Sequence, residues 1–219
     1  MKVGIVGLGL IGGSFAKAYH AAGWEVLAAD IDRQMLDFAM LQGAVNGELT
    51  EDAQADCDLI LIAVYPRAAV EYLQKHGAKI GKKPVVIDCC GTKRVVCEAC
   101  FPLAEQYGFT YLGGHPMAGT HNSGFKYATA TMYHGAPMVL VPADFNNIEL
   151  LSRVKELLSP AGFGRFLQKA LDHLDQNPDM PRIITCYNVS EWAEGGAALQ
   201  PTVGNGFGYL EAVRDALIR

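Results

Sequence analysis

KVGIVGLGLIGGS, residues 2–14, predicts how the chain begins to fold. Its first part, KVGIVG, is a short apolar run typical of a buried strand. From Leu8 onward, apolar side chains recur at helical spacing until Gly23 ends the pattern. The stretch therefore predicts a strand, a tight glycine-rich turn and a helix.

Three glycines in this turn, Gly7, Gly9 and Gly12, form a GxGxxG pattern. In a strand–turn–helix unit the first glycine makes the turn, the second lets a pyrophosphate approach the backbone, and the third lets the helix pack on the strand. The helix N-terminus then faces the phosphate charge. We therefore expect a dinucleotide to contact these glycines together with Leu10 and Ile11.

The next predicted strand, residues 25–30, ends in an acidic residue, Asp30. A carboxylate in this position can bond the hydroxyls of the adenosine ribose and would repel the 2′-phosphate of NADP. NAD is therefore the expected cofactor. Arg33, which follows closely and could contact the cofactor, leaves NADP open.

Apolar strands and amphipathic helices alternate as far as about residue 165. This alternation predicts a Rossmann-type doubly wound, mostly parallel sheet with helices on both faces over residues 1–165. The expected helix over residues 92–108 is interrupted near Pro102. Residues 166–219 are expected to form a short, divergent helical segment. Further strands are expected at residues 58–65, 84–90, 109–114 and 136–142, and further helices at 33–44, 67–80 and 148–162.

Composition excludes several other classes of protein. The formal net charge is -5 and no Lys/Arg cluster occurs, which argues against nucleic-acid binding. The longest apolar run, residues 59–65, is too short to cross a bilayer, and the first strand leaves no room for a signal peptide. We expect a cytoplasmic protein without membrane contact.

Four of the six cysteines lie between residues 89 and 100, where they include a CxxC pattern. A zinc site needs four ligands, and no second CxxC or spaced histidine pair accompanies this one. Free structural thiols and no bound metal are therefore expected.

Loops that follow strands of such a sheet open onto one ligand crevice, at the carboxyl edge. The loop after the strand at residues 58–65 is expected to contact the cofactor through Val64, Tyr65 and Pro66. The loop DCCGTK, residues 88–93, carries Asp88 and Lys93, which are either part of a site or a solvated ion pair.

A second motif, GGHPMAGTHNSG, occupies residues 113–124. His115 follows a predicted strand and precedes Pro116, which keeps the local backbone extended. Histidine exchanges a proton near neutral pH, so His115 is the candidate acid–base group. Gly113 and Gly114 are expected to let this loop pass close to the nicotinamide.

The segments VGLGLIGGS, GGHPMAGTHNSGF and VLVP resemble the prephenate and arogenate dehydrogenases, over about residues 1–165. This resemblance implies NAD-dependent oxidative decarboxylation of prephenate to 4-hydroxyphenylpyruvate, or the equivalent oxidation of arogenate, in tyrosine biosynthesis. It identifies His115 with the family's catalytic histidine. It also implies that a substrate pocket is lined by Thr120, His121 and Ser123, although for His121 a purely structural role is an equal alternative.

The chain departs from this family in two places. The family's loop D-x-G-S-x-K contains a serine where this chain has Gly91, with Thr92 next to it as a substrate-binding candidate. Residues 166–219 are shorter than the family's helical dimerisation domain, so a homodimer stays open. Two other functions also stay open: a catalytically impaired NAD-binding sensor or partner subunit, and another hydride-transfer enzyme such as an imine or hydroxy-acid reductase.

Overall fold

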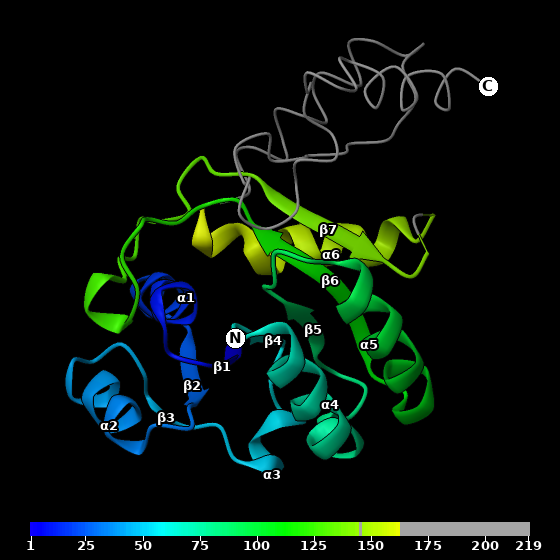
Figure 1. Ribbon diagram of the computed structural model, residues 1–219, viewed down its shortest axis with the longest axis horizontal. Helices are drawn as coiled ribbons and strands as arrows, with labels where there is room; N and C mark the ends of the chain where they lie inside the picture. Colours follow the sequence, from blue (N-terminus) through cyan, green and yellow to red (C-terminus); the bar gives the residue numbers. More distant parts are fainter. Residues whose placement is uncertain (145, 163–219) are drawn as a thin grey trace, which may run out of the picture. The chain divides into compact units, whose positions relative to one another are not determined.

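The computed structural model describes residues 1–144 and 146–162; the segment predicted over residues 166–219 lies outside them. A seven-stranded sheet with the order β3-β2-β1-β4-β5-β6-β7 organises this part of the chain (Figure 1). The strands are β1 (Lys2–Val6), β2 (Glu25–Ala29), β3 (Gly47–Glu48), β4 (Leu59–Ile62), β5 (Val85–Asp88), β6 (Thr110–Pro116) and β7 (Met138–Pro142). The helices are α1 (Leu10–Ala21), α2 (Arg33–Leu41), α3 (Glu51–Gln54), α4 (Pro66–Ile80), α5 (Arg94–Tyr107) and α6 (Ile148–Leu158), with 3-10 turns at Phe125–Tyr127 and Ser159–Ala161.

Strand pairing is parallel from β3 through β6, and only β7 is antiparallel to its neighbour. The prediction of a Rossmann-type, mostly parallel sheet is therefore confirmed. The order of the strands reverses at β1, which lies between β2 and β4. In such a sheet, ligands bind beyond the carboxyl ends of the strands at this reversal.

Both faces of the sheet are buried, which explains why its strands are continuously apolar rather than alternating. Ile5 of β1 faces a core shared with α1, α2 and α6, in which Phe15 and Tyr133 stack with their ring centroids 4.2 Å apart. Val6, the next residue, faces a second core shared with α4 and α5, which includes Leu73. The sheet is thus a rigid central layer that fixes the loops at its carboxyl edge.

Helix α5 passes through Pro102 without a break, so the expected interruption is wrong. Proline removes the hydrogen bond to the carbonyl four residues earlier, which belongs to the exposed Glu98 and can be hydrated instead. Cys97, Cys100 and Ala104 are buried on the sheet side of α5 on both sides of Pro102, and this packing keeps the helix continuous.

Two elements, β3 and α3, were not predicted, because they are too short to carry a periodic pattern. In the described ranges 1–144 and 146–162, no helix has both the length and the apolar character needed to cross a membrane.

Candidate active site

The glycine turn after β1 has the shape that the GxGxxG pattern predicts. Gly7 has φ +91°, and a Cβ there would lie 2.6 Å from Cγ1 of Val64. A Cβ on Gly12 would collide with the carbonyl oxygen of Gly7, so α1 packs directly on the turn. A Cβ on Gly9 would meet nothing within 4 Å. The turn is therefore closed on its protein side and open at Gly9, where a pyrophosphate could approach.

Leu10 and Ile11 begin α1 directly after this open position. Gly9 is the N-cap residue of α1, and it supplies no side-chain hydrogen bond to the first turn. The amide groups of a helix start carry partial positive charge, so this end of α1 can receive a phosphate.

Asp30 directly follows β2 and is tied to the glycine turn. Its Oδ2 accepts a hydrogen bond of 2.6 Å from the Leu8 amide, and its Oδ1 accepts one of 2.9 Å from the Asp32 amide. A carboxylate has about four lone-pair sites, so two bonds leave acceptor capacity for a ribose diol. Asp30 therefore both shapes the turn and can receive a ligand.

Arg33, the other predicted residue near the ribose position, is held by two carboxylates. Its Nη1 lies 2.6 Å from Oε2 of Glu48, and its Nε lies 3.1 Å from Oδ1 of Asp37. The hydrogen bond to Glu48, followed by the charge of Asp37, raises the pKa of the Arg33 guanidinium. Its positive charge is thus offset locally rather than directed at an incoming phosphate.

The loop after β4 carries the other residues that were predicted to contact the cofactor, Val64, Tyr65 and Pro66. The side chain of Val64 packs against Gly7. The carbonyl oxygen of Val64 accepts a hydrogen bond from the Cys90 thiol at 3.5 Å. Tyr65 is the N-cap of α4 and is 87% exposed, while Pro66 is the first residue of that helix. All three residues therefore follow a central strand, and Val64 borders the glycine turn.

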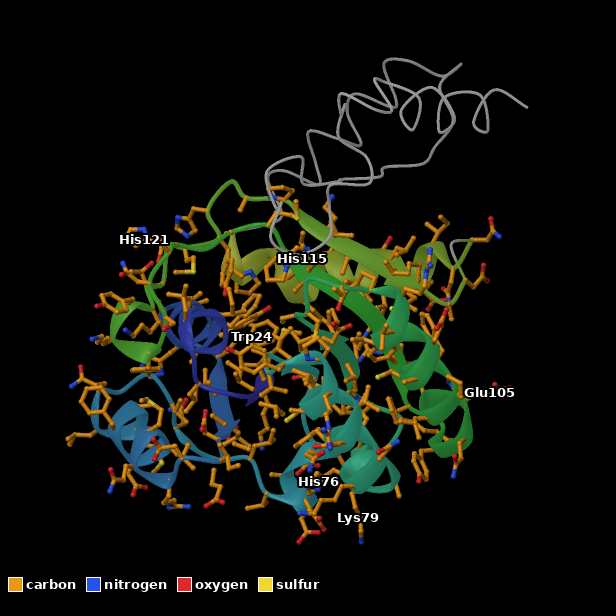
Figure 2. The ribbon with its side chains drawn as sticks, viewed as in Figure 1. Trp24, His76, Lys79, Glu105, His115 and His121 are labelled. Carbon is orange, nitrogen blue, oxygen red and sulfur yellow. The ribbon has the colours of Figure 1, made fainter. Side chains whose placement is uncertain are left out.

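His115 lies inside β6, not after it as expected. The strand continues to Pro116 because β7 pairs with it there, His115 opposite Val139 and Pro116 opposite Met138. By strand alternation, half-buried His115 lies on the same face of the sheet as Tyr111. Figure 2 shows it at the carboxyl end of β6.

The predicted substrate-pocket residues Thr120, His121 and Ser123 are all exposed, in the segment that connects β6 to β7. Oγ1 of Thr120 accepts a hydrogen bond of 3.2 Å from the Asn122 amide, which forms a local turn. Figure 2 shows His121 well apart from His115. The described residues alone do not bring these three side chains to the histidine.

Segment 117–137, which we call the crossing segment, is fastened to the start of α1 by contacts that the sequence did not reveal. Buried Ser14 accepts a hydrogen bond of 3.1 Å from the Thr129 amide, and the hydroxyl of Tyr133 donates one of 2.7 Å to the Ile11 carbonyl. The only available signal was the second glycine of the pair at residues 12 and 13, which leaves room for Phe125.

Asp88 and Lys93, at the end of β5 and the start of α5, form a buried ion pair rather than a solvated one. Asp88 is fully buried, and the Lys93 side chain is 17% exposed. The ammonium of Lys93 donates to Oδ1 of Asp88 and to the Gly114 carbonyl. Exposed Thr92 lies immediately before this lysine. Sequence reasoning left this pair undecided because burial depends on the neighbouring strand.

Gly113 and Gly114 have a different role from the one expected, because they lie in β6 and not in a loop. A Cβ on Gly113 would lie 2.5 Å from Sγ of Cys97, and one on Gly114 would collide with the Asp88 carbonyl and the Ile87 side chain. These two glycines let α5 and β5 pack closely against β6.

Five cysteines of the described ranges are free: Cys57, Cys89, Cys90, Cys97 and Cys100. Burial raises the pKa of Cys90 to about 12 and the pKa of Cys57 to about 11. These thiols are therefore poor nucleophiles at neutral pH. Residues 1–144 and 146–162 hold no group of three metal-ligating side chains, and Cys186 lies outside them.

Residues 15–166 match the family model described as "Prephenate dehydrogenase, nucleotide-binding domain". A prephenate dehydrogenase of Lactococcus lactis subsp. cremoris is 32% identical over 155 residues, which cover 68% of this chain and 43% of that protein. The chain thus spans less than half the length of this relative.

Two solved structures share the fold and part of the sequence. An arogenate dehydrogenase of Synechocystis is 26% identical with a TM-score of 0.67, and the match covers 74% of this chain and 57% of that one. A prephenate dehydrogenase of Aquifex aeolicus is 28% identical with a TM-score of 0.63, over 73% and 58% of the two chains.

Proposed function

Since this chain belongs to the prephenate dehydrogenase family by its nucleotide-binding domain, we propose that it oxidises prephenate with NAD as the hydride acceptor. One observation carries the proposal. The parallel strands β1, β2 and β6 present the glycine turn, Asp30 and His115 at the same edge of the sheet. A dinucleotide lying across this edge would bring its reactive ring toward the strand that carries the histidine.

The charges around Asp30 support NAD rather than NADP. Asp30 directly follows β2, where a ribose diol is bound in such folds, and Asp32 lies two residues further along the chain. The nearby Arg33 is paired with Glu48 and Asp37. A 2′-phosphate would therefore approach carboxylates and a guanidinium whose charge is already offset.

The chemistry that we propose for His115 is acceptance of one proton. Prephenate carries a hydroxyl and a hydrogen on C4, and bound NAD supplies the acceptor for that hydrogen as hydride. As the hydride leaves, His115 takes the hydroxyl proton, and C4 becomes a ketone carbon. Loss of the ring carboxylate as carbon dioxide leaves a phenolate, which recovers the proton. The product is 4-hydroxyphenylpyruvate, and the gain of an aromatic ring drives the reaction.

The direct test is the formation of reduced cofactor, followed by its near-ultraviolet absorbance. Prephenate and arogenate are supplied in turn, each with NAD and with NADP. We expect turnover with prephenate and NAD, and none with His115→Asn measured in parallel. Turnover with arogenate alone would reassign the substrate within the same family.

The same assay separates the two other candidate functions. NAD binding without turnover of either substrate would indicate a sensor or partner subunit, for which the absence of the family's serine at Gly91 is the relevant observation. Turnover of a cyclic imine or a hydroxy acid, with none of prephenate, would indicate a reductase of another specificity.

A further inference from the structure

Strand β6 extends beyond the end of its neighbour β5. Parallel pairing of β5 with β6 ends at Ile87 opposite Leu112, whereas β6 continues to Pro116. The peptide groups of Gly114, the residue immediately before His115, therefore lie past the last pair of this ladder. Buried peptide groups without partners are destabilising, so something must replace the missing strand.

Two side chains replace it. Oδ2 of Asp88 accepts a hydrogen bond of 3.2 Å from the Gly114 amide, and the Lys93 ammonium donates to the Gly114 carbonyl. Both peptide groups of the residue before His115 are thus held by the ion pair. Gly114 is required there, because a Cβ would collide with the backbone of Asp88.

Asp88 is itself fixed from several directions. Its Oδ1 accepts from the Cys90 amide at 2.9 Å and from Lys93, and its Oδ2 accepts from the Tyr111 hydroxyl at 2.6 Å as well as from Gly114. Burial, followed by the charge of Asp88, raises the pKa of Tyr111, so its hydroxyl stays a donor. A fully buried carboxylate with this many donors cannot rotate without losing several bonds at once.

We propose that Asp88, Lys93 and Tyr111 form a positioning unit for His115. These three residues hold the extended end of β6 in place and so set where the imidazole stands relative to the nicotinamide and the substrate hydroxyl. They act through the Gly114 backbone and need no contact with the substrate. The proposal rests on the proposed function of His115, and it explains why an ion pair is buried at this edge.

Tyr111→Phe and Lys93→Met test the unit, and Lys83→Met is the matched control. Lys83 also pairs with an aspartate, Asp58, at 3.1 Å, but it precedes β5 and so lies at the opposite edge of the sheet. Tyr111→Phe keeps the ring and removes only the hydroxyl, so it reports on the unit even if loss of Lys93 prevents folding.

We expect both variants of the unit to lower kcat by about 10- to 100-fold, the range for a small misplacement of a catalytic group, with NAD affinity unchanged. Lys83→Met should keep full kcat. Normal kcat in Tyr111→Phe and Lys93→Met would overturn the proposal, as would a fall in NAD affinity equal to the fall in kcat.

A second readout keeps this test separate from the test of the activity. The ring proton resonance of His115, assigned by its loss in His115→Asn, should move in Tyr111→Phe and stay in place in Lys83→Met. This result is expected whether or not the protein turns over prephenate. An unmoved His115 resonance in Tyr111→Phe would overturn the positioning role even if the protein is an active dehydrogenase.

Discussion

Asp30 combines two tasks in one carboxylate. It fixes the start of the glycine turn through the Leu8 amide, and its remaining lone pairs leave acceptor capacity for the ribose diol of the proposed cofactor. His115 also combines a backbone task with a side-chain task, because its peptide pairs with β7 while its imidazole serves as the proposed proton acceptor. Substitutions at these two positions separate binding from chemistry.

Asp30→Ala should weaken NAD binding and narrow the preference for NAD over NADP by about 1 to 3 kcal/mol, the range for hydrogen bonds to a charged group. Equilibrium titration with NAD and with NADP measures both affinities and hence the preference. Glu48→Gln is the companion variant, since it releases Arg33 from its 2.6 Å pair and should raise NADP affinity while NAD affinity stays unchanged. Equal affinity of the unmutated protein for both cofactors would contradict the role of Asp30.

His115→Asn should lower kcat by about 10² to 10⁴-fold, the usual contribution of a positioned acid–base group, and leave NAD affinity within a few-fold. Asparagine keeps the backbone pairing of β6 with β7, so the strand should stay intact. Steady-state kinetics and NAD titration on the same preparation measure both quantities. Nearly full turnover, or joint loss of NAD binding and activity, would make His115 a structural residue.

The start of helix α1 has two roles, as the proposed binding site for the cofactor phosphate and as the packing site of the crossing segment. Its N-terminus is the proposed phosphate site, and its first residues contact the crossing segment through Gly13, Ser14 and the Ile11 carbonyl. The three glycines at 9, 12 and 13 therefore differ in what a methyl group would meet, although they look alike in the sequence. This difference can be measured with single alanine substitutions.

Gly13→Ala should destabilise the protein by about 1 to 3 kcal/mol, the range for overpacking a core. Its Cβ would lie 2.6 Å from the Phe125 ring and 3.0 Å from Cβ of Ala128. Gly9→Ala is the matched variant: its Cβ meets nothing within 4 Å, so stability should be kept while NAD affinity falls. Urea unfolding and NAD titration of the two variants check this, and the reverse pattern would refute our assignment of the two glycines.

At the scale of the described domain, the core on the α4 and α5 side of the sheet buries thiols as well as hydrocarbon. Cys57, Cys90 and Cys100 belong to the core shared with α4 and α5, and burial raises the pKa of each above the ordinary thiol value of 9.0, to between about 11 and about 12. A thiol whose pKa is higher in the folded chain than in the unfolded chain links stability to pH.

The sign of this dependence follows from the protons bound. Below pH 9 the thiols are protonated in both states, and their contribution to stability is fully present. As the pH rises from 9 toward 11 or 12, thiols of the unfolded chain ionise first, so the free energy of unfolding should fall. Urea midpoints at neutral pH and above pH 9 measure the fall. Cys57→Ala should make it smaller, and a midpoint that rises with pH would contradict the prediction.

The local pattern of the chain was sufficient for the fold class. Strand and helix periods, GxGxxG and Asp30 after the second strand predicted the parallel sheet and its nucleotide edge, because each signal is contained in one strand–turn–helix unit. The place of His115 after a predicted strand and before Pro116 made it the candidate acid–base group, and the resemblance identified it with the family's catalytic histidine. The short elements β3 and α3 were not predicted, because two- and four-residue elements are too short to show a periodic pattern of apolar residues.

The arrangement around His115 was decided only in three dimensions. Pairing with β7 extends β6 through Pro116, β5 ends earlier, and this mismatch in length brings Asp88 and Lys93 to the Gly114 peptide. The bond from Tyr133 to Ile11 likewise joins residues 122 positions apart. Such contacts depend on strand order and strand length. The local sequence determines neither, because both result from the packing of segments that are distant along the chain.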